Sequence, residues 1–409
     1  MRVIVQKFGG SSVATPEGRE RAGVLVARAR EEGYAPVVVV SAMGRNGDPY
    51  ATDTLMEVAR REYRETSPRE LDLLASCGEI ISAVVMTNTL RRAGLDAMAL
   101  SGGQAGIVTD DNFTDARILR VQPDHLLRHL SEGKVVVVAG FQGVTESGDV
   151  TTLGRGGSDT TAAALGAALR AEVVEIYTDV SGIKTADPRL VPEARTLDVV
   201  AYDEIVQMAH EGAKVVHPRA VEIAMRASIP LRVKSTFDDG PGTLVTHTHE
   251  VARGWSGLRD GRPVTGVTHI PGLARVRVSP EAGADSTELE LRMFQALAGV
   301  GISVDMINVS PGHKSFVVKE EVAPRAEEVL RGLGLEPEVT PGCAKVSVVG
   351  TGMRGLPGVM ANVVQALHGA GVRILQTADS HVTISCLVSA SDLGGAVAAL
   401  HRQFRLGEG

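Results

Sequence analysis

The first part of the chain alternates short apolar runs with amphipathic stretches. The apolar runs are VIV (3–5), VVVV (37–40), VVVVAG (135–140) and VVEIYTD (173–179), and the helical patterns cover residues 16–32, 69–93 and 158–170. Continuous apolar runs of this length are typical of strands buried on both faces of a parallel sheet. The alternation therefore predicts an α/β fold, a doubly wound three-layer αβα domain with a mainly parallel sheet over residues 1–246.

The last part of the chain contains an internal repeat. QALAGVGI at 295–302 and QALHGAGV at 365–372 are identical at five of eight positions. In each copy a strand follows the helical stretch, at 302–310 and 372–380. A second strand (314–318, 382–388) and a helix (323–332, 392–403) come next. This order predicts two ferredoxin-like units, 266–338 and 339–409, packed on each other. Residues 247–265 have no clear period and are interpreted as a linker.

Composition narrows the class of protein. Apolar residues make up 44% and charged residues 22% of the chain, which is ordinary for a soluble globular protein. The net charge of -7 argues against a nucleic-acid-binding surface. The three cysteines are widely spaced, so they indicate neither a disulfide framework nor a metal site and fit a reducing cytoplasm. The N-terminus becomes polar too early for a signal peptide, and no apolar run approaches about 18 residues.

The end of the first predicted strand has the features of a phosphate site. Lys7 is followed by Gly9, Gly10 and two serines, and then by a helix. Glycines let backbone N–H groups approach phosphate oxygens, and the N-terminus of a helix favours anions. A Gly-Gly turn after a strand can also be an ordinary turn, but a lysine in such a position usually has a partner.

The stretch TTLGRGGSDTTAAALGAAL (151–169) gives the strongest single signal. Arg155 lies among three glycines, and Ser158 or Asp159 is predicted to cap the following helix. A cap alone does not require an arginine flanked by glycines. An arginine held in such a turn can donate two parallel hydrogen bonds to a carboxylate or a phosphate.

Other polar residues follow predicted strands, where ligands of open α/β sheets collect. Ser41 and Thr52 follow the second strand, and Glu79 stands at the start of a helical pattern. Helix capping and a first-turn glutamate are the structural alternatives for these three. Further polar candidates come later in the chain, where solvated loops are the alternative: Thr178, Asp179, Lys184, Asp187, Arg189 and Lys214.

These segments together resemble the amino acid kinase family and, within it, the aspartate kinases. The matching motifs are KFGGSS (7–12), VVVVSAM (37–43), CGE (77–79), GFQG (140–143), TTLGRGGSDTTA (151–162), YTDVSGIKTADPR (177–189) and GAKVVHPRA (212–220). The LGRGGSD run is specific to aspartate kinases within the superfamily. The repeat in the tail is similar to their paired ACT regulatory domains, so the resemblance covers nearly the whole chain.

Within the family, several segments are most similar to the diaminopimelate-sensitive aspartate kinases of Bacillus-type bacteria. They are SAMGRNGDPYATDTL (41–55), SPRELDLLASCGE (67–79), GISVDMINVSP (301–311) and LQTADSHVTI (375–384). The usual ACT glycine turn is kept as LPGV (356–359) in the second copy but altered to SPEAGADS (279–286) in the first. The effector therefore stays open among meso-diaminopimelate, the expected one, lysine and threonine.

The resemblance implies that ATP and L-aspartate react to give 4-phospho-L-aspartate and ADP. This reaction is the first step towards lysine and diaminopimelate, threonine and methionine. The resemblance also implies that Mg²⁺ is held mainly by the ATP phosphates and water, with no dedicated protein metal site. It further implies a cytoplasmic enzyme that forms a homodimer through its ACT domains and binds neither nucleic acid nor membrane.

The resemblance also assigns roles to residues. The catalytic residues are Lys7, Arg155 and Asp159. The aspartate site comprises Ser41, Thr52, Glu79, Phe141, Arg155 and Ser158. The nucleotide site comprises Lys7, Phe8, Gly9, Gly10, Thr178, Asp179, Lys184, Asp187, Arg189 and Lys214. Effector contacts are expected at Asp305, Met306, Ile307, Gln376, Thr377 and Asp379, for which interface packing is the alternative.

Two other functions compete with this interpretation. One is a different amino acid kinase of the same fold, acting on glutamate, acetylglutamate or a nucleotide. The LGRGGSD run and the paired ACT tail disfavour it. The other is an amino-acid-sensing ACT protein with a degenerate kinase domain. The presence of Lys7, Glu79, Arg155 and Asp179 argues against that alternative.

Overall fold

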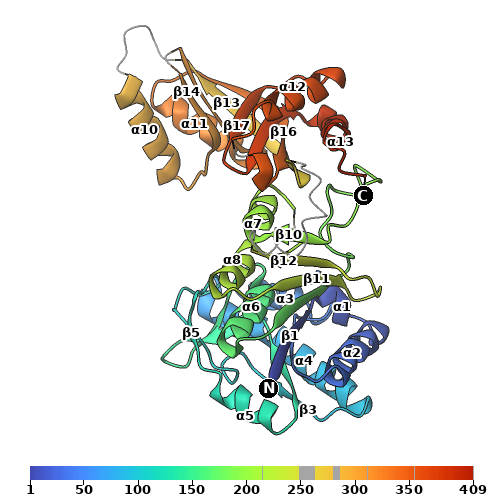
Figure 1. The fold of residues 1–409 in the computed structure, drawn as a ribbon. Helices are drawn as coiled ribbons and strands as arrows, with labels where there is room; N and C mark the ends of the chain where they lie inside the picture. Colours follow the sequence, from blue (N-terminus) through green and yellow to red (C-terminus); the bar gives the residue numbers. More distant parts are fainter. Residues whose placement is uncertain (214, 248–262, 280–285, 311, 354, 409) are drawn as a thin grey trace. The chain divides into compact units, whose positions relative to one another are not determined.

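The computed structural model describes the chain except residues 214, 248–262, 280–285, 311, 354 and 409 (Figure 1). Its backbone contacts divide the chain into two compact units. The first unit contains Met1–Ile183, Thr196–Ala209 and Lys214–Leu258, and the second contains Lys184–Arg195, His210–Ala213 and Arg259–Gly409. Most of the predicted linker and of the altered SPEAGADS loop lies outside the described residues.

The first unit is built on an eight-stranded sheet in the order β10-β12-β11-β9-β1-β2-β6-β3. Its strands are β1 (Arg2–Phe8), β2 (Tyr34–Val40), β3 (Ala97–Leu100), β6 (Val135–Ala139), β9 (Val173–Thr178), β10 (Val199–Ala201), β11 (Leu231–Ser235) and β12 (Thr243–Thr246). All neighbours are parallel except β11 and β12. The predicted mainly parallel sheet is confirmed.

Helices cover both faces of this sheet (Figure 1). Apolar side chains of α2 (Pro16–Glu31) and α4 (Pro68–Arg92) share one core with β1, β2 and β6. On the other face, α6 (Gly157–Leu169) packs on β1 and beside α8 (Pro218–Ala227). Aromatic residues make up only 3% of the chain, and this core is built mainly from Val, Ala and Leu, with Phe8 and Tyr177 as its aromatic members.

Further elements surround the main sheet. A four-stranded sheet, which the apolar pattern did not predict, contains β4 (Ile107–Thr109), β5 (Ile118–Val121), β7 (Gln142–Val144) and β8 (Val150–Thr152). Its strands have three or four residues, too short to show a clear period in sequence. The remaining helices of this unit are α1 (Gly10–Val13), α3 (Thr52–Glu62), α5 (Asp124–Ser131) and α7 (Tyr202–His210).

Helix α4 is long and apolar enough, by length and composition, to cross a membrane. However, 56% of its apolar window is buried within the protein. Ser67 caps it by accepting a hydrogen bond from the Glu70 N–H at 3.4 Å, and Pro68 occupies its first turn. Because the buried side chains face the sheet core, α4 is the core helix of a globular unit.

The second unit contains one six-stranded sheet in the order β14-β15-β13-β16-β18-β17. Its strands are β13 (Gly266–Val278), β14 (Asp305–Ser310), β15 (His313–Lys319), β16 (Pro337–Val349), β17 (Gln376–Asp379) and β18 (Thr383–Ser389). The first strands of the two repeats, β13 and β16, pair antiparallel and join the copies into a continuous sheet. Strands β14 and β17 are shorter than the predicted 302–310 and 372–380.

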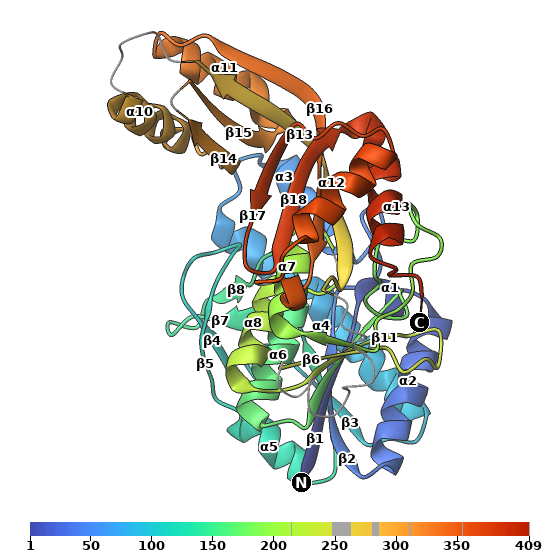
Figure 2. The same cartoon turned by 45° about the horizontal axis from the view of Figure 1, so that its top comes forward.

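Each repeat contributes two helices to this sheet (Figure 2). Helices α10 (Ser286–Gly299) and α11 (Ala323–Gly332) form a core with β13 and β15. Helices α12 (Val359–Gly369) and α13 (Leu393–Gln403) form the equivalent core with β16 and β18. The tandem ferredoxin-like architecture is therefore confirmed.

Candidate functional site

Two oppositely charged side chains meet where β1 ends and α6 begins. Lys7 Nζ lies 2.7 Å from Asp159 Oδ1, and only 12% and 11% of the two side chains are exposed. A lysine is almost never this buried unless it is paired. The pair therefore fixes a positive charge at the carboxyl edge of the parallel sheet, next to the start of a helix.

The backbone after β1 approaches its neighbours closely. The Gly9 N–H donates to the Tyr177 carbonyl oxygen at 3.3 Å. A Cβ atom on Gly10 would lie 2.8 Å from the carbonyl oxygens of Ala42 and Gly44, so no side chain fits there. These glycines bring the loops after β1 and β2 together and leave a Cβ-free backbone beside Lys7.

The glycine-rich turn before α6 contains two left-handed residues, Gly154 (φ 70°) and Gly156 (φ 71°). The N-cap of α6 is Gly156, so the prediction of Ser158 or Asp159 as cap is wrong. Both lie inside the first turn, because the left-handed glycine starts the helix earlier. Arg155 is exposed on the turn and forms no ion pair with the residues that the structure describes.

Glu79 lies in the middle of α4 rather than at the start of a helix, so the first-turn alternative is wrong. Its side chain is buried, with 3% of the residue exposed. Oε1 accepts a hydrogen bond from the Ala42 N–H at 3.1 Å, whereas Oε2 has no partner among the described residues. Burial raises the pKa of Glu79 to about 8. A buried acceptor without a donor is suited to receive a cationic group.

His217, which sequence reasoning did not select, packs against the glycine turn. Its backbone N–H donates to Asp159 Oδ2 at 3.4 Å, and burial lowers the pKa of its imidazole. A Cβ atom on Gly156 would lie 2.3 Å from its Cγ. The HP dipeptide before α8 was the available signal, but only the fold brings this ring beside the turn.

Phe141 occupies the left-handed region with φ 69°. Its N–H donates to Thr161 Oγ1 at 3.1 Å, and its carbonyl accepts from the Leu153 N–H at 2.8 Å. Thr161 of α6 and Leu153, which directly follows β8, thus hold the backbone of Phe141 in place. An unfavourable conformation fixed from both sides is common at ligand sites.

The loops after β2 and β9 meet through an ion pair that sequence reasoning missed. Arg45 Nη2 lies 2.9 Å from Asp179 Oδ2, and Thr178 donates to the other Asp179 oxygen. Both charged groups are largely exposed, so the pair contributes at most about 1 kcal/mol. Ser41 also lies at this edge, where its N–H donates to the Phe8 carbonyl, and Thr52 begins α3.

The remaining predicted nucleotide residues are not among these contacts. Lys184, Asp187 and Arg189 belong to the second unit, where Arg189 pairs with Asp187 at 2.7 Å. Lys214 lies outside the described residues. The first unit therefore brings together Lys7 to Gly10, Ser41, Glu79, Phe141 and the 154–159 turn, with Thr178 and Asp179 at the same sheet edge.

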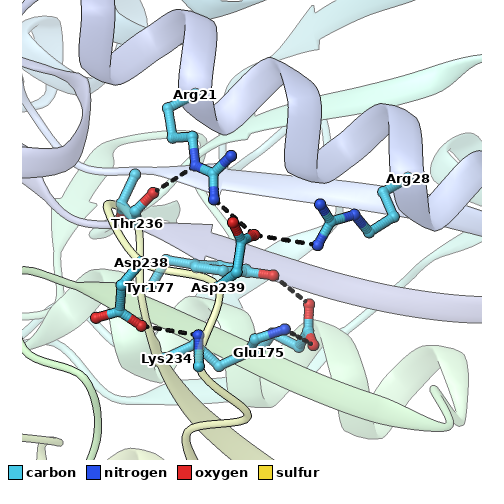
Figure 3. Close-up of polar contacts among 9 residues, drawn as sticks. Arg21, Arg28, Glu175, Tyr177, Lys234, Thr236, Asp238 and Asp239 are labelled. Atoms are coloured by element: carbon cyan, nitrogen blue, oxygen red, sulfur yellow. Dashed lines mark hydrogen bonds and ion pairs between the residues drawn. The ribbon is translucent and has the colours of Figure 1, made fainter.

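A buried polar cluster supports this edge from the other face of the sheet (Figure 3). Glu175 accepts hydrogen bonds from Gln6 at 3.0 Å and Tyr177 at 2.8 Å, and pairs with Lys234 at 3.4 Å. Burial raises the pKa of the Tyr177 hydroxyl, so it stays a neutral donor. The Tyr177 ring stacks on Phe8, 4.8 Å between centroids, which steadies the strand that carries Lys7.

A neighbouring ion-pair group secures the loop after β11 (Figure 3). Asp239 lies 2.6 Å from Arg21 and 3.3 Å from Arg28, and Arg21 also donates to the Thr236 carbonyl at 3.2 Å. Both arginines come from α2. The ion pairs therefore connect α2 to the loop after β11.

The predicted effector residues lie on the edge strands of the second unit. Gln376 donates to the Met306 carbonyl, so the two repeats contact each other there. Asp305 pairs with the buried Lys345 at 2.6 Å, and Lys345 also pairs with Glu211 at 3.0 Å. Ile307 is exposed. A cavity of about 530 Å³ opens beside the start of α12, and its lining includes Met353, Met360, Thr377, Asp379 and Ile384.

Comparison with known proteins adds independent findings. The model of the amino acid kinase family matches residues 2–235, and that of the ACT domain matches residues 338–402. The chain is 49% identical over 406 residues to aspartokinase 1 of Bacillus subtilis, covering 99% of this chain and 100% of that protein. It is 42% identical over 417 residues to an aspartokinase of Thermus thermophilus, covering 99% of each.

Solved structures agree with these matches. E. coli aspartokinase III in complex with aspartate and ADP, in its R-state, superposes with a TM-score of 0.77 at 27% identity, over 98% of this chain and 99% of that one. The T-state of the same enzyme, in complex with lysine and aspartate, gives a TM-score of 0.75 over the same shares of the two chains, also at 27% identity.

The geometry of the glycine turn predicts that Gly156→Ala destabilises the protein by more than about 2 kcal/mol. A left-handed alanine costs about 1 kcal/mol, and its Cβ would also collide with His217. Gly148→Ala is the matched control, since its φ of 92° is also positive but no atom lies within 4 Å of the added Cβ. Urea unfolding measures both, and equal losses would contradict the close packing.

The raised pKa of Glu79 predicts a pH-dependent stability. The folded state binds one proton more than the unfolded state between about pH 4.5 and pH 8, so stability falls over this range as pH rises. The slope is at most about 1.4 kcal/mol per pH unit. Glu79→Gln should remove this slope. Urea unfolding of both proteins without ligand at pH 5, 6.5 and 8 tests it, and parallel profiles would refute it.

Proposed function

Because the chain belongs to the aspartokinase group of the amino acid kinase family, we propose that its first unit phosphorylates L-aspartate. The γ-phosphoryl group of ATP is transferred to the β-carboxylate, which gives 4-phospho-L-aspartate and ADP. The observation that carries the proposal is the buried Lys7–Asp159 pair beside a Cβ-free backbone, with a buried, unpartnered acceptor on Glu79.

The chemistry requires no general base. A carboxylate with an ordinary pKa of about 3.9 is already ionised at neutral pH. One β-carboxylate oxygen forms the new bond to phosphorus while the bond between the γ-phosphorus and the bridging oxygen of ADP breaks. The protein has to align two anions that repel each other and neutralise their charge.

On the phosphate side, Lys7 neutralises the transferring phosphoryl group. Asp159 holds the ammonium at the start of α6. The Gly9 N–H is already bonded to the Tyr177 carbonyl, so of the expected cradle after Phe8 it is the Gly10 N–H that donates to phosphate oxygens. The 2.7 Å pair keeps Lys7 in place before substrate arrives, which lowers the cost of reorganisation in the transition state.

On the aspartate side, Arg155 binds the α-carboxylate through two parallel hydrogen bonds. Glu79 Oε2 accepts the α-ammonium group, and Glu79 releases its proton when this cation binds, since an opposite charge nearby favours the ionised acid. The remaining pocket residues by family match are Ser41, Thr52, Phe141 and Ser158.

On the nucleotide side, Thr178 and Asp179 of the first unit contact ATP. Mg²⁺ supplies charge neutralisation on the ATP phosphates when it is bound. The described residues contain no group of three or more His, Cys, Asp or Glu side chains arranged for a metal. Because Mg²⁺ prefers octahedral, largely hydrated oxygen sites, the proposal assigns the ion to ATP oxygens and water, with Asp159 as an assisting carboxylate.

The second unit regulates the first through an amino-acid effector. Its proposed contacts are Asp305, Met306, Ile307, Gln376, Thr377 and Asp379, and meso-diaminopimelate is the expected ligand. The cavity that Thr377 and Asp379 help to line supports an amino-acid-sized ligand. We further propose the domain limits 1–246, 247–265, 266–338 and 339–409, a homodimer through the ACT domains and a cytoplasmic location.

Substitution of Lys7 and substitution of Arg155 should affect different kinetic constants. Lys7→Ala should lower kcat by about 10²–10³ with little change in the aspartate KM, because it acts on the transition state. Arg155→Ala should chiefly raise the aspartate KM, by about 10–100-fold for a lost charged bidentate contact. A hydroxamate assay for acyl phosphate measures both.

The exposed Lys319→Ala and Arg64→Ala variants serve as charge-matched controls. A near-normal kcat of the Lys7 variant, or an unchanged aspartate KM of the Arg155 variant, would refute the assigned roles. The same assay with glutamate in place of aspartate tests the substrate, and faster turnover of glutamate would refute the proposed reaction.

The effector proposal predicts that meso-diaminopimelate raises the melting temperature more than lysine or threonine does. Asp305→Asn should reduce the shift, because the carboxylate that receives an ammonium group is lost. Asp203→Asn in the first unit is the matched control. Stabilisation by threonine alone would overturn the assignment.

A further inference from the structure

Two histidines of α5 point their ring nitrogens at each other. The Nε2 atoms of His125 and His129 lie 3.1 Å apart, one helical turn from each other. The ring centroids are 4.8 Å apart, with the ring planes at 66°. Neither residue belongs to the phosphate or aspartate site described above.

The other ring nitrogens are both engaged by hydrogen-bond acceptors. His125 Nδ1 lies 3.1 Å from the Gln104 carbonyl oxygen, and His129 Nδ1 lies 3.3 Å from a carboxylate oxygen of Glu132. A carbonyl and a carboxylate can only accept, so both Nδ1 atoms carry hydrogen. In two neutral imidazoles, therefore, both Nε2 atoms present lone pairs to each other.

Facing lone pairs at this distance repel unless a cation lies between them. We propose that His125 and His129 chelate one divalent transition-metal ion, of the Zn²⁺ type, through their Nε2 atoms. Two Zn–N bonds of about 2.0–2.1 Å at a tetrahedral angle place the nitrogens about 3.3 Å apart, close to the separation here. Imidazole nitrogens suit Zn²⁺ and Ni²⁺, whereas Mg²⁺ prefers oxygen ligands.

The surroundings have the arrangement that metal-binding histidines usually have. Such histidines donate their second N–H to a carboxylate or a backbone carbonyl, which fixes the ring orientation and tautomer. Glu132 is itself held by Lys134 at 2.7 Å. No third His, Cys, Asp or Glu ligand converges within the described part of the chain, so water fills the remaining positions.

The pair lies away from the nucleotide edge. Helix α5 precedes β6 directly, and Glu132 is followed by the start of that strand at Val135. Both views place α5 beside the N-terminus of the chain, the amino end of β1 (Figures 1 and 2). The ion would therefore join two successive turns of α5 and leave the Lys7 edge unchanged.

Titration of Zn²⁺ into the chelator-treated full-length chain, followed by calorimetry, tests the proposal. One ion should bind per chain with the histidine pair, and His125→Ala or His129→Ala should abolish that event. Glu132→Gln should weaken it about 10-fold, because the carboxylate only orients the ring. A tenfold excess of Mg²⁺ should not compete.

His368→Ala is the matched control, because this exposed histidine also lies on a helix. Alanine favours helices, so the two α5 variants should fold, and circular dichroism checks this. Equal Zn²⁺ binding by the double variant and the unmodified chain would overturn the proposal. The absence of saturable binding to the unmodified chain would also overturn it.

Discussion

The ion pair of Lys7 and Asp159 is the constraint on which the catalytic unit depends. A buried ammonium is costly without a counter-charge, so the end of β1 and the first turn of α6 must meet. The glycines around the pair follow from that approach. At Gly10 and Gly156 any side chain would collide with backbone or with the His217 ring. The local sequence is thus dictated by a contact between residues far apart in the chain.

The electrostatics of the site follow a consistent pattern. The proposed reaction brings two anions together, and the site presents two cations, one buried on Lys7 and one exposed on Arg155. Glu79, the proposed acceptor of the α-ammonium group, is buried and has its pKa raised to about 8. Before substrate binds, it therefore adds little negative charge near the phosphates.

The sequence predicted the elements well and the contacts between them poorly. Four apolar runs and a 70-residue repeat were enough for the parallel sheet and the paired ferredoxin-like units, because burial on both faces leaves a clear local pattern. The apolar pattern did not predict the small sheet of β4, β5, β7 and β8, because strands of three or four residues are too short to show a periodic pattern. Long-range packing, which periodicity does not encode, decides the remaining features. It places Glu79 in the middle of a helix, makes Gly156 the N-cap of α6, and brings His217 to Asp159 and Arg45 to Asp179.

The division of the chain has a consequence for regulation. Before its final passage at 258/259, the chain passes between the two compact units at 183/184, 195/196, 209/210 and 213/214. The second unit therefore includes two short segments from the catalytic sequence. One of them contains Glu211, whose carboxylate shares the buried Lys345 with Asp305. The two carboxylates compete for one buried ammonium group, with Glu211 largely buried and Asp305 more than half exposed. An effector bound at the proposed site that neutralises Asp305 would leave Lys345 to pair with Glu211 alone. The residues next to Glu211 in the chain belong to the first unit, so the proposed effector site is linked to the proposed catalytic unit through a short stretch of chain.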